Sequence, residues 1–271
     1  MTTPIEEPLV FDLESDGLLD TISKIHCIHV HDRATGKSYR FNDGWYHDLE
    51  GRRTERAPAD GTVEDGVRFL HGRYVCGQNI IKFDIPAIRK LFPWFQPARV
   101  FDTKVASQVI WTNLFDVDMA LLRKGKLPQE FAKKGLVGRH SLAAWGYRLG
   151  NYKGDFDPKD YGHTWATMPF AEEMDTYGAQ DVVVTNLWFE KIRSKNYSQE
   201  CLDLEMRVAE IIHRQEQRGF RFDRAAADEL VAALQRRRAE LDAELQQLFP
   251  PWEVVVKSGI SKVNNSKLGR V

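Results

Sequence analysis

The sequence predicts an α/β fold, with a mixed sheet flanked by helices and an all-helical segment after it. In the first 110 residues, short apolar runs alternate with segments of helical periodicity. The first three runs follow one another closely, as antiparallel strands do, whereas the fourth comes after a helix, as a parallel crossover does. Beyond residue 202 only helical periodicity is visible. The predicted sheet is therefore mixed, with five strands.

The predicted strands and helices of the first half follow from local signals. Apolar runs at 9–13, 25–30 and 37–41 predict three strands. Thr62 and Asp65 have the spacing of a capping box, so a helix is expected from there to about residue 72, followed by a strand at 73–77. A helix from Asp84 to about residue 92 is expected next, because Asp is a good N-cap and Pro86 suits a first turn. The fifth strand lies near residue 100, and another helix follows.

The second half predicts three further helical regions. Ser141 caps a helix at 142–149, a polar loop spans 150–169, and a long helix follows at 170–193. The residues at 219–223 predict a turn between two helices, hence a helical hairpin. We therefore predict three parts: a catalytic domain at 1–197, the hairpin at 198–249, and a flexible basic tail at 250–271, whose last 18 residues hold four basic residues and no acid.

Composition excludes several classes of protein. The 271 residues contain 38 Lys and Arg against 39 Asp and Glu, which excludes a protein that holds DNA by bulk positive charge. No apolar run approaches the roughly 18 to 20 residues that span a bilayer, and the first residues lack a signal peptide's pattern, so we expect a cytoplasmic protein with no membrane partner. Three widely spaced cysteines predict free thiols rather than a disulfide framework.

Carboxylates lie near the ends of two predicted strands. One pair lies at the end of the first strand, and a further carboxylate lies at the junction after the fourth. Asp12 and Glu14 are two positions apart, so both side chains leave the strand on one face, either toward a site or as a solvated strand end. Asp84 ends the sequence Asn-x-x-x-Phe-Asp that begins at Asn79, directly after an apolar strand. Two interpretations of Asp84 stay open, a metal ligand or only the cap of the following helix.

A third acidic position lies on the long predicted helix. Tyr177 and Asp181 are four residues apart, so the phenol and the carboxylate share one helical face. Gly178 lies between them and costs about 1 kcal/mol relative to Ala in a helix, which indicates close approach of another backbone. The alternative is a surface pair without a site.

In this order and spacing the three motifs resemble the DEDD exonucleases that carry a tyrosine. They are most similar to the proofreading domain of family A DNA polymerases, particularly the replicative polymerases of short-tailed bacteriophages. Supporting sequence lies at 10–19, 118–128, 140–150 and 180–185, and the resemblance covers roughly residues 9–249. It implies a ribonuclease H-like fold and a 3′-5′ exonuclease acting on a single-stranded DNA 3′ end, in the context of DNA replication.

Four converging carboxylates, Asp12, Glu14, Asp84 and Asp181, would repel one another unless cations neutralise them, and oxygen ligands select Mg²⁺ or Mn²⁺. Two such ions can activate water and stabilise the leaving oxygen of a phosphodiester. The resemblance implies that Asp12, Glu14 and Asp181 hold one ion, that Asp12 also bridges to the second, and that Asp84 reaches the second largely through water. Tyr177 is expected to orient the water as a neutral phenol.

The resemblance also implies two substrate contacts, Leu18 packing on the terminal base and Asn79 contacting the terminal nucleotide; a loop leucine and a turn asparagine are the alternatives. Residues 123–140 contain six basic residues against one acid, Glu130, and could attract phosphates or form a solvated loop. Cys27, His29 and His31 alternate onto one strand face, which we interpret as the polar outer face of a half-buried strand.

The polymerase motifs of this family are not among these 271 residues, so we expect proofreading for a polymerase region outside them. Whether the chain stands alone, pairs with a separate polymerase chain or is one piece of a longer protein stays open. The apolar residues of the predicted hairpin could bury a face against such a partner or against the catalytic domain. Two further alternatives remain: an RNA-trimming exonuclease of the same class, and a non-catalytic module that binds single strands or docks a polymerase.

Overall fold

The computed structural model describes residues 6–152, 154–249, 253–256 and 260–263, and the chain forms two compact units, Met1–Gln217 and Arg218–Val271. The first unit reaches past residue 197, where the catalytic domain was predicted to end. Its last helix, α8 (Gln199–Arg218), buries Leu202 and Met206 in a core cluster of the sheet domain. The first part of the predicted hairpin therefore packs on the sheet domain.

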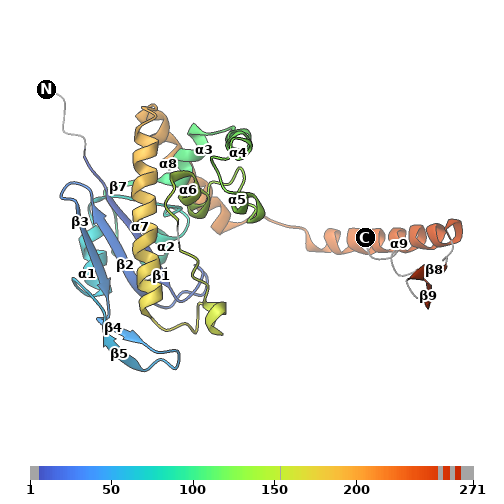
Figure 1. Ribbon diagram of the computed structural model, residues 1–271, viewed down its shortest axis with the longest axis horizontal. Coiled ribbons are helices and arrows are strands. Elements are labelled where there is room, and N and C mark those ends of the chain that lie inside the picture. The colour runs from blue at the N-terminus through green and yellow to red at the C-terminus, as the bar shows by residue number, and fades with distance from the viewer. Residues whose placement is uncertain (1–5, 153, 250–252, 257–259, 264–271) are drawn as a thin grey trace. The chain divides into compact units, whose positions relative to one another are not determined.

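The centre of the first unit is a five-stranded mixed sheet (Figure 1). Its strand order is β3-β2-β1-β6-β7, with β1 antiparallel to β2 and parallel to β6. The strands are β1 (Leu9–Ser15), β2 (Ile25–Asp32), β3 (Lys37–Asn42), β6 (Tyr74–Gly77) and β7 (Arg99–Asp102). This is the topology of a ribonuclease H-like fold, so the predicted fold class is confirmed.

Helices cover both faces of the sheet, and the alternation of β1 decides which residues face which helices. Leu9, Phe11 and Leu13 belong to the core cluster that also contains residues of α1 (Val63–Leu70) and α2 (Asp84–Leu91). Val10 instead belongs to the cluster with residues of α7 (Glu172–Arg193), the long helix that crosses the other face (Figure 1). The even-numbered residues of β1 therefore point toward α7.

The remaining helices of this unit largely match the sequence prediction. Ser141 accepts a hydrogen bond from the backbone of Ala144 at the start of the helix at Leu142–Leu149, and Thr62 with Asp65 forms the predicted capping box of α1. Between β7 and α7 the chain also forms α3 (Thr103–Ile110), α4 (Leu114–Arg123), α5 (Gln129–Lys133), α6 (Leu142–Leu149) and a short 3-10 helix (Pro158–Tyr161).

The polar stretch between β3 and α1 contains a second sheet that the sequence did not predict. Its strands are β4 (Trp45–His47) and β5 (Arg53–Arg56), paired antiparallel around a turn in which Gly51 has a φ of 79°. Both strands are short, and β5 is exposed throughout, so neither shows the apolar alternation by which strands are recognised. Tyr46 of β4 is nevertheless buried, and its contact is described with the site below.

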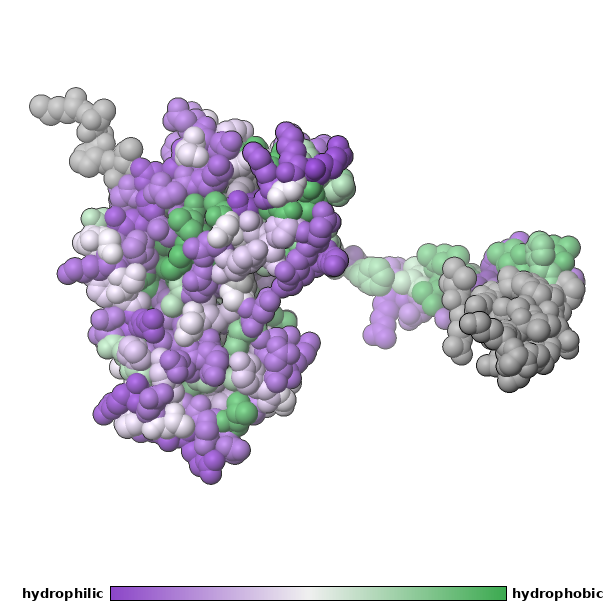
Figure 2. Space-filling view, viewed as in Figure 1, coloured by the Kyte–Doolittle hydropathy of each residue, from purple (hydrophilic) through white to green (hydrophobic). Residues whose placement is uncertain are grey.

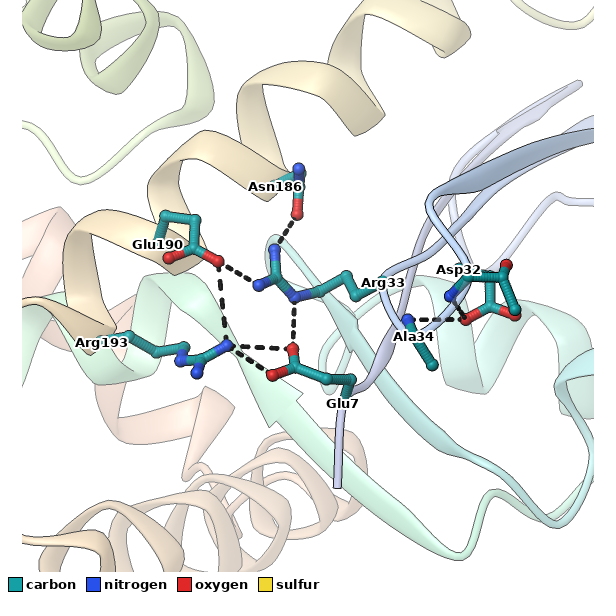
Figure 3. A network of polar contacts seen from close by, with 8 residues as sticks. Glu7, Asp32, Arg33, Ala34, Asn186, Glu190 and Arg193 are labelled. Carbon is teal, nitrogen blue, oxygen red and sulfur yellow. Dashed lines mark hydrogen bonds and ion pairs between the residues drawn. The ribbon is translucent and has the colours of Figure 1, made fainter. Parts of the chain in front are cut away.

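A polar network holds the C-terminal half of α7 against the start of β1 (Figure 3). Arg33, in the turn after β2, donates to Glu7, Asn186 and Glu190. Arg193 donates to Glu7 as well, at 2.7 and 2.9 Å. The same helix that crosses the sheet is thus fixed at its far end by groups from two other segments of the chain.

The second unit contains α9 (Arg224–Leu248), which has no buried residue. Asp223 is its N-cap, and the Asp223 side chain accepts a hydrogen bond from the backbone of Ala226. Figure 2 shows apolar side chains on its surface; Leu230, Leu234, Leu241 and Leu245 are exposed. In the segment predicted to be a flexible tail, β8 (Glu253–Val256) pairs with β9 (Ile260–Val263), because the consecutive valines favour extended backbone. Among the described residues, no helix combines the length and apolarity needed to cross a membrane.

Candidate active site

The predicted acidic pair on β1 lies beneath α7. Asp12 and Glu14 follow Val10 on the same face of the strand, and Glu14 is only 7% exposed. The register between β1 and β2 shifts between Glu14 and Ser15, as it does at a β-bulge. The strand therefore delivers two carboxylates to its α7 face and then changes direction.

Helix α7 brings the third carboxylate to the same place. Asp181 is 3% exposed and faces the sheet, one helical turn after Tyr177. One carboxylate oxygen each from Asp12, Glu14 and Asp181 can be chosen so that all lie within 4.8 Å of one another. The structure thus unites three predicted site residues that are up to 169 positions apart in the chain.

Asp84 is the first residue of α2 and is 4% exposed. Burial raises the pKa of its carboxyl group to about 7, and the charges of Asp102 and Asp181 add to that shift, while a backbone N–H of Leu13 opposes it. The interpretation of Asp84 as a mere helix cap was wrong. Phe83 occupies the N-cap position and there is no side-chain cap, because Asp84 lies inside the helix and turns toward Leu13 and Asp181.

This set of groups fits hard divalent cations. The cluster offers only carboxylate oxygens, the ligands that Mg²⁺ and Mn²⁺ prefer. Burial, together with the charges of Asp102 and Asp181, raises the pKa of Asp84, so a negative charge at this position is unfavourable without a cation. Asp12, Glu14 and Asp181 are placed so that one ion could bind to all three.

The pKa of Asp84 predicts how stability depends on pH without divalent ions. From about pH 4, near the ordinary pKa of Asp, to about pH 7, the folded state keeps the Asp84 proton that the unfolded state has lost. The free energy of unfolding should therefore fall as pH rises through this window, and the fall should be smaller in Asp84→Asn. Urea unfolding in EDTA at several pH values measures both. Equal pH dependence in the two proteins would show that Asp84 ionises normally.

A buried carboxylate that the sequence did not identify anchors α7 next to the site. Asp175 is 0% exposed, and its Oδ2 accepts from Arg40 Nη1 at 2.6 Å and from Tyr46 Oη at 2.9 Å. His29 Nε2 lies 3.2 Å from its Oδ1. Burial alone would raise the pKa of Asp175, but contacts with His29, Tyr46 and Arg40 outweigh burial and lower it. Partners from β2, β3 and β4 thus hold the turn of α7 that carries Tyr177.

Gly178 lets α7 approach the sheet, but its neighbours are side chains rather than the predicted backbone. A Cβ at this position would lie 2.8 Å from Cδ2 of His29 and 3.4 Å from Cγ of Glu14. His29 faces α7 because it is the β2 partner of Asp12. Gly178 therefore lets α7, which carries Asp181, lie close to His29 and Glu14.

The interpretation of Cys27, His29 and His31 as a polar outer face was wrong. Cys27 is 0% and His29 2% exposed, because α7 covers this end of β2, whereas His31 lies beyond it and contacts Ser38. Cys27, His29 and Asp175 could offer ligand atoms within 4.8 Å of one another. Burial and the charges of Glu14 and Asp175 raise the pKa of the Cys27 thiol, and Arg40 already neutralises Asp175, so we assign this group to packing and hydrogen bonding.

Cavities border the cluster. Glu14 and Leu18 line a cavity of about 390 Å³ together with Phe83 and Trp165, and Leu18 is 76% exposed, so it is accessible to a ligand. Tyr177 lines another cavity of about 750 Å³, together with Lys134 and several aromatic residues. The six basic residues of 123–140 are exposed, and among them Lys134 pairs with Asp155 and Glu130.

Asn79 lies in the turn between β6 and α2, and its backbone is left-handed, with a φ of 63°. Its side-chain Oδ1 accepts a hydrogen bond from Lys104 Nζ at 3.0 Å. The alternative of a turn-forming asparagine is thus correct for its backbone. The side chain remains available for the predicted contact through its NH₂ group.

Relatives of this chain are found among bacteriophage proteins, although no family model matches it. It is 35% identical over 284 aligned residues to the DNA-directed DNA polymerase of Enterobacteria phage T3, and equally to that of Escherichia phage T7. Each alignment covers 90% of this chain and 37% of the polymerase. The chain thus spans little more than a third of the length of these relatives.

Similar folds occur among nucleases of known structure. An apo nuclease has a TM-score of 0.49 at 16% identity, covering 81% of this chain and 89% of that chain. Brucella melitensis NrnC with bound Mg²⁺ has a TM-score of 0.47 at 15% identity, covering 81% of this chain and 92% of that chain. Escherichia coli RNase D has a TM-score of 0.42 at 13% identity, covering 78% of this chain and 46% of that chain. The sequence comparison alone shows that this chain is related to the DNA polymerases of phages T3 and T7. It confirms the resemblance to the DNA polymerases of such bacteriophages, which the motifs of the chain indicated.

Proposed function

We propose that this protein is a metal-dependent 3′-5′ exonuclease that removes nucleoside monophosphates from single-stranded or frayed DNA 3′ ends. The observation that carries the proposal is the convergence of Asp12, Glu14 and Asp181 within 4.8 Å, on the face that also holds Tyr177. Asp84 adds a fourth carboxyl group whose ionisation is unfavourable without a cation. Such a group of acids suits phosphodiester hydrolysis with two divalent ions.

In this mechanism Asp12, Glu14 and Asp181 would hold the ion on the side of the attacking water, and Asp12 and Asp84 would help to hold a second ion. Two bound ions would supply the positive charge that stabilises the attacking and leaving oxygens. Tyr177 orients the water by hydrogen bonding, as a neutral phenol does at pH 7. Leu18, exposed in the cavity beside Glu14, packs on the terminal base.

The substrate is a DNA end that has come unpaired, since a terminal phosphodiester reaches such a site only after its base leaves the duplex, and mismatched ends unpair at the lowest cost. We infer proofreading for a DNA polymerase region outside these residues, because the relatives are DNA polymerases that extend beyond the matched part. The exposed apolar residues of α9 offer a surface for that region or for a separate polymerase chain. Because its relatives are phage proteins, we also propose that this protein acts in the host cytoplasm.

Degradation of a 5′-labelled single-stranded DNA oligonucleotide tests the proposal. With Mg²⁺ or Mn²⁺ we expect a ladder that shortens from the 3′ end, and none with EDTA. A matched RNA oligonucleotide in a parallel reaction should be degraded much more slowly. Faster loss of the RNA would indicate an RNA-trimming enzyme instead. Binding of the DNA without any ladder would indicate a non-catalytic module.

A further inference from the structure

The turn between β6 and α2 carries Asn79 and leads into Asp84, the first residue of α2, and a single buried carboxylate fixes its backbone. Asp102 is 1% exposed. Its Oδ1 accepts from the backbone N–H of Asn79 at 3.0 Å and of Lys104 at 2.9 Å, and its Oδ2 accepts from that of Ile81 at 3.2 Å. One side chain therefore caps α3 and ties that cap to the turn.

This arrangement places Lys104, in the first turn of α3, against the side chain of Asn79. Lys104 Nζ lies 3.0 Å from Asn79 Oδ1. An ammonium group has donors and no acceptor, so only the oxygen of the Asn79 amide can face it. The NH₂ group of Asn79 must then point away from Lys104. Asp102 holds the left-handed backbone of Asn79, so the turn cannot rotate to change the direction of this amide.

We propose that Lys104 is a positioning residue for substrate recognition, one that orients the Asn79 amide so that its N–H donors face an acceptor atom of the 3′-terminal nucleotide. This role rests on the proposed function, because it assumes a nucleotide at the carboxylate cluster. Without Lys104 the amide could present either its oxygen or its nitrogen, and the orientation in which oxygen meets an acceptor repels the substrate. Lys104 thereby acts through Asn79 rather than on the phosphate.

Another lysine beside the turn provides a matched control. Lys82 donates to both carboxylate oxygens of Glu216 at 2.7 Å, and no contact between Lys82 and the Asn79 side chain is found in the described part of the chain. Lys82→Met and Lys104→Met each remove one positive charge from the same region. Only Lys104→Met should release the Asn79 amide.

The test is a double-mutant cycle on binding of a fluorescent single-stranded DNA oligonucleotide, measured by anisotropy in EDTA with the 271-residue chain. Asn79→Gly removes the side chain and keeps the left-handed backbone. We expect Lys104→Met and Asn79→Gly each to weaken binding about tenfold, as loss of a hydrogen bond involving a charged group does, and the double variant to bind no more weakly than Asn79→Gly. Lys104→Arg, which keeps a head group that only donates, should retain most of the affinity.

Salt dependence separates this role from direct phosphate binding. For single strands, each phosphate contact contributes about 0.7 to the slope of log K against log salt. An unchanged slope in Lys104→Met supports the positioning role. A shallower slope, with additive effects in the double variant, would overturn it and assign Lys104 to a phosphate. If neither the wild-type chain nor Lys82→Met binds or degrades the oligonucleotide, the proposed function fails, and this role fails with it.

Discussion

Replacing both acids of β1 by neutral isosteres, Asp12→Asn with Glu14→Gln, is expected to reduce oligonucleotide degradation at least about a thousandfold. Both residues share the cluster with Asp181, and a divalent ion stabilises the transition state of phosphodiester hydrolysis by several kcal/mol only where it is held. The amides keep the shape of the side chains, so the loss would come from charge. Initial rates over a wide range of Mn²⁺ concentrations measure it.

The same double variant should be at least as stable as the wild type in EDTA. Glu14 and Asp181 are 7% and 3% exposed, so their negative charges repel across a poorly solvated space when no cation is present. Mn²⁺ should raise the melting temperature of the wild type and leave that of the variant nearly unchanged.

A matched control is Asp32→Asn, a buried acid at the opposite end of the β1–β2 ladder that accepts from Ala34 and Thr35. It should lower stability and leave the rate per folded molecule unchanged. Degradation by the Asp12/Glu14 variant within tenfold of the wild type would refute the assignment of the site.

The sequence sufficed to predict the parts of the site that follow from short-range periodicity. Asp12 and Glu14 share a face because strand side chains alternate, and Tyr177 and Asp181 share one because a helix repeats every 3.6 residues. The resemblance to the phage polymerases joined these local motifs, which spacing alone could not do. The mixed sheet followed from the order of strands and helices for the same local reason.

The anchor of α7 could not be predicted, because its members come from distant segments and are polar types typical of a surface. Arg40 and Tyr46 are 135 and 129 positions from Asp175, and no local pattern relates them. Tyr46 also lies on a three-residue strand, too short to show alternation. The one available signal was Gly178, whose cost in a helix indicated close approach but not its partner, His29.

Asp84 shows a different limit. Good N-cap residues and metal ligands are the same residue types, so the sequence could not decide between the two interpretations. The structure excludes the cap, because the helix begins at Asp84 itself and the charge of Asp181 acts on its carboxyl group. The role as a metal ligand is part of our proposal. In the same way, burial of Cys27 and His29 depends on α7, an element far along the chain, and not on the alternation within β2.

Gly178→Ala is expected to lower the degradation rate about a hundredfold, the effect of displacing a reacting group by about 1 Å. Helix propensity alone favours alanine by about 1 kcal/mol. The new Cβ, however, would lie 2.8 Å from Cδ2 of His29, a ring held between β2 and Asp175, and 3.4 Å from Glu14. Because the ring has little room to move, α7 must shift outward and carry Asp181 away from Asp12 and Glu14.

Gly66→Ala distinguishes this displacement from a general loss of packing. Gly66 is also helical, and a Cβ there would lie 2.7 Å from Cγ of the buried Phe41, on the α1 face of the sheet. Overpacking at either position should cost about 1 to 3 kcal/mol before the gain in helix propensity. Gly66→Ala should therefore match Gly178→Ala in urea unfolding while degrading the oligonucleotide at nearly the wild-type rate. Similar rates in both variants would mean that the contact between Gly178 and His29 does not set the geometry of the carboxylates.

In a His29→Ala background, where the ring is absent, Gly178→Ala should cause little further loss of the degradation rate, since the new methyl group then meets no obstacle on β2.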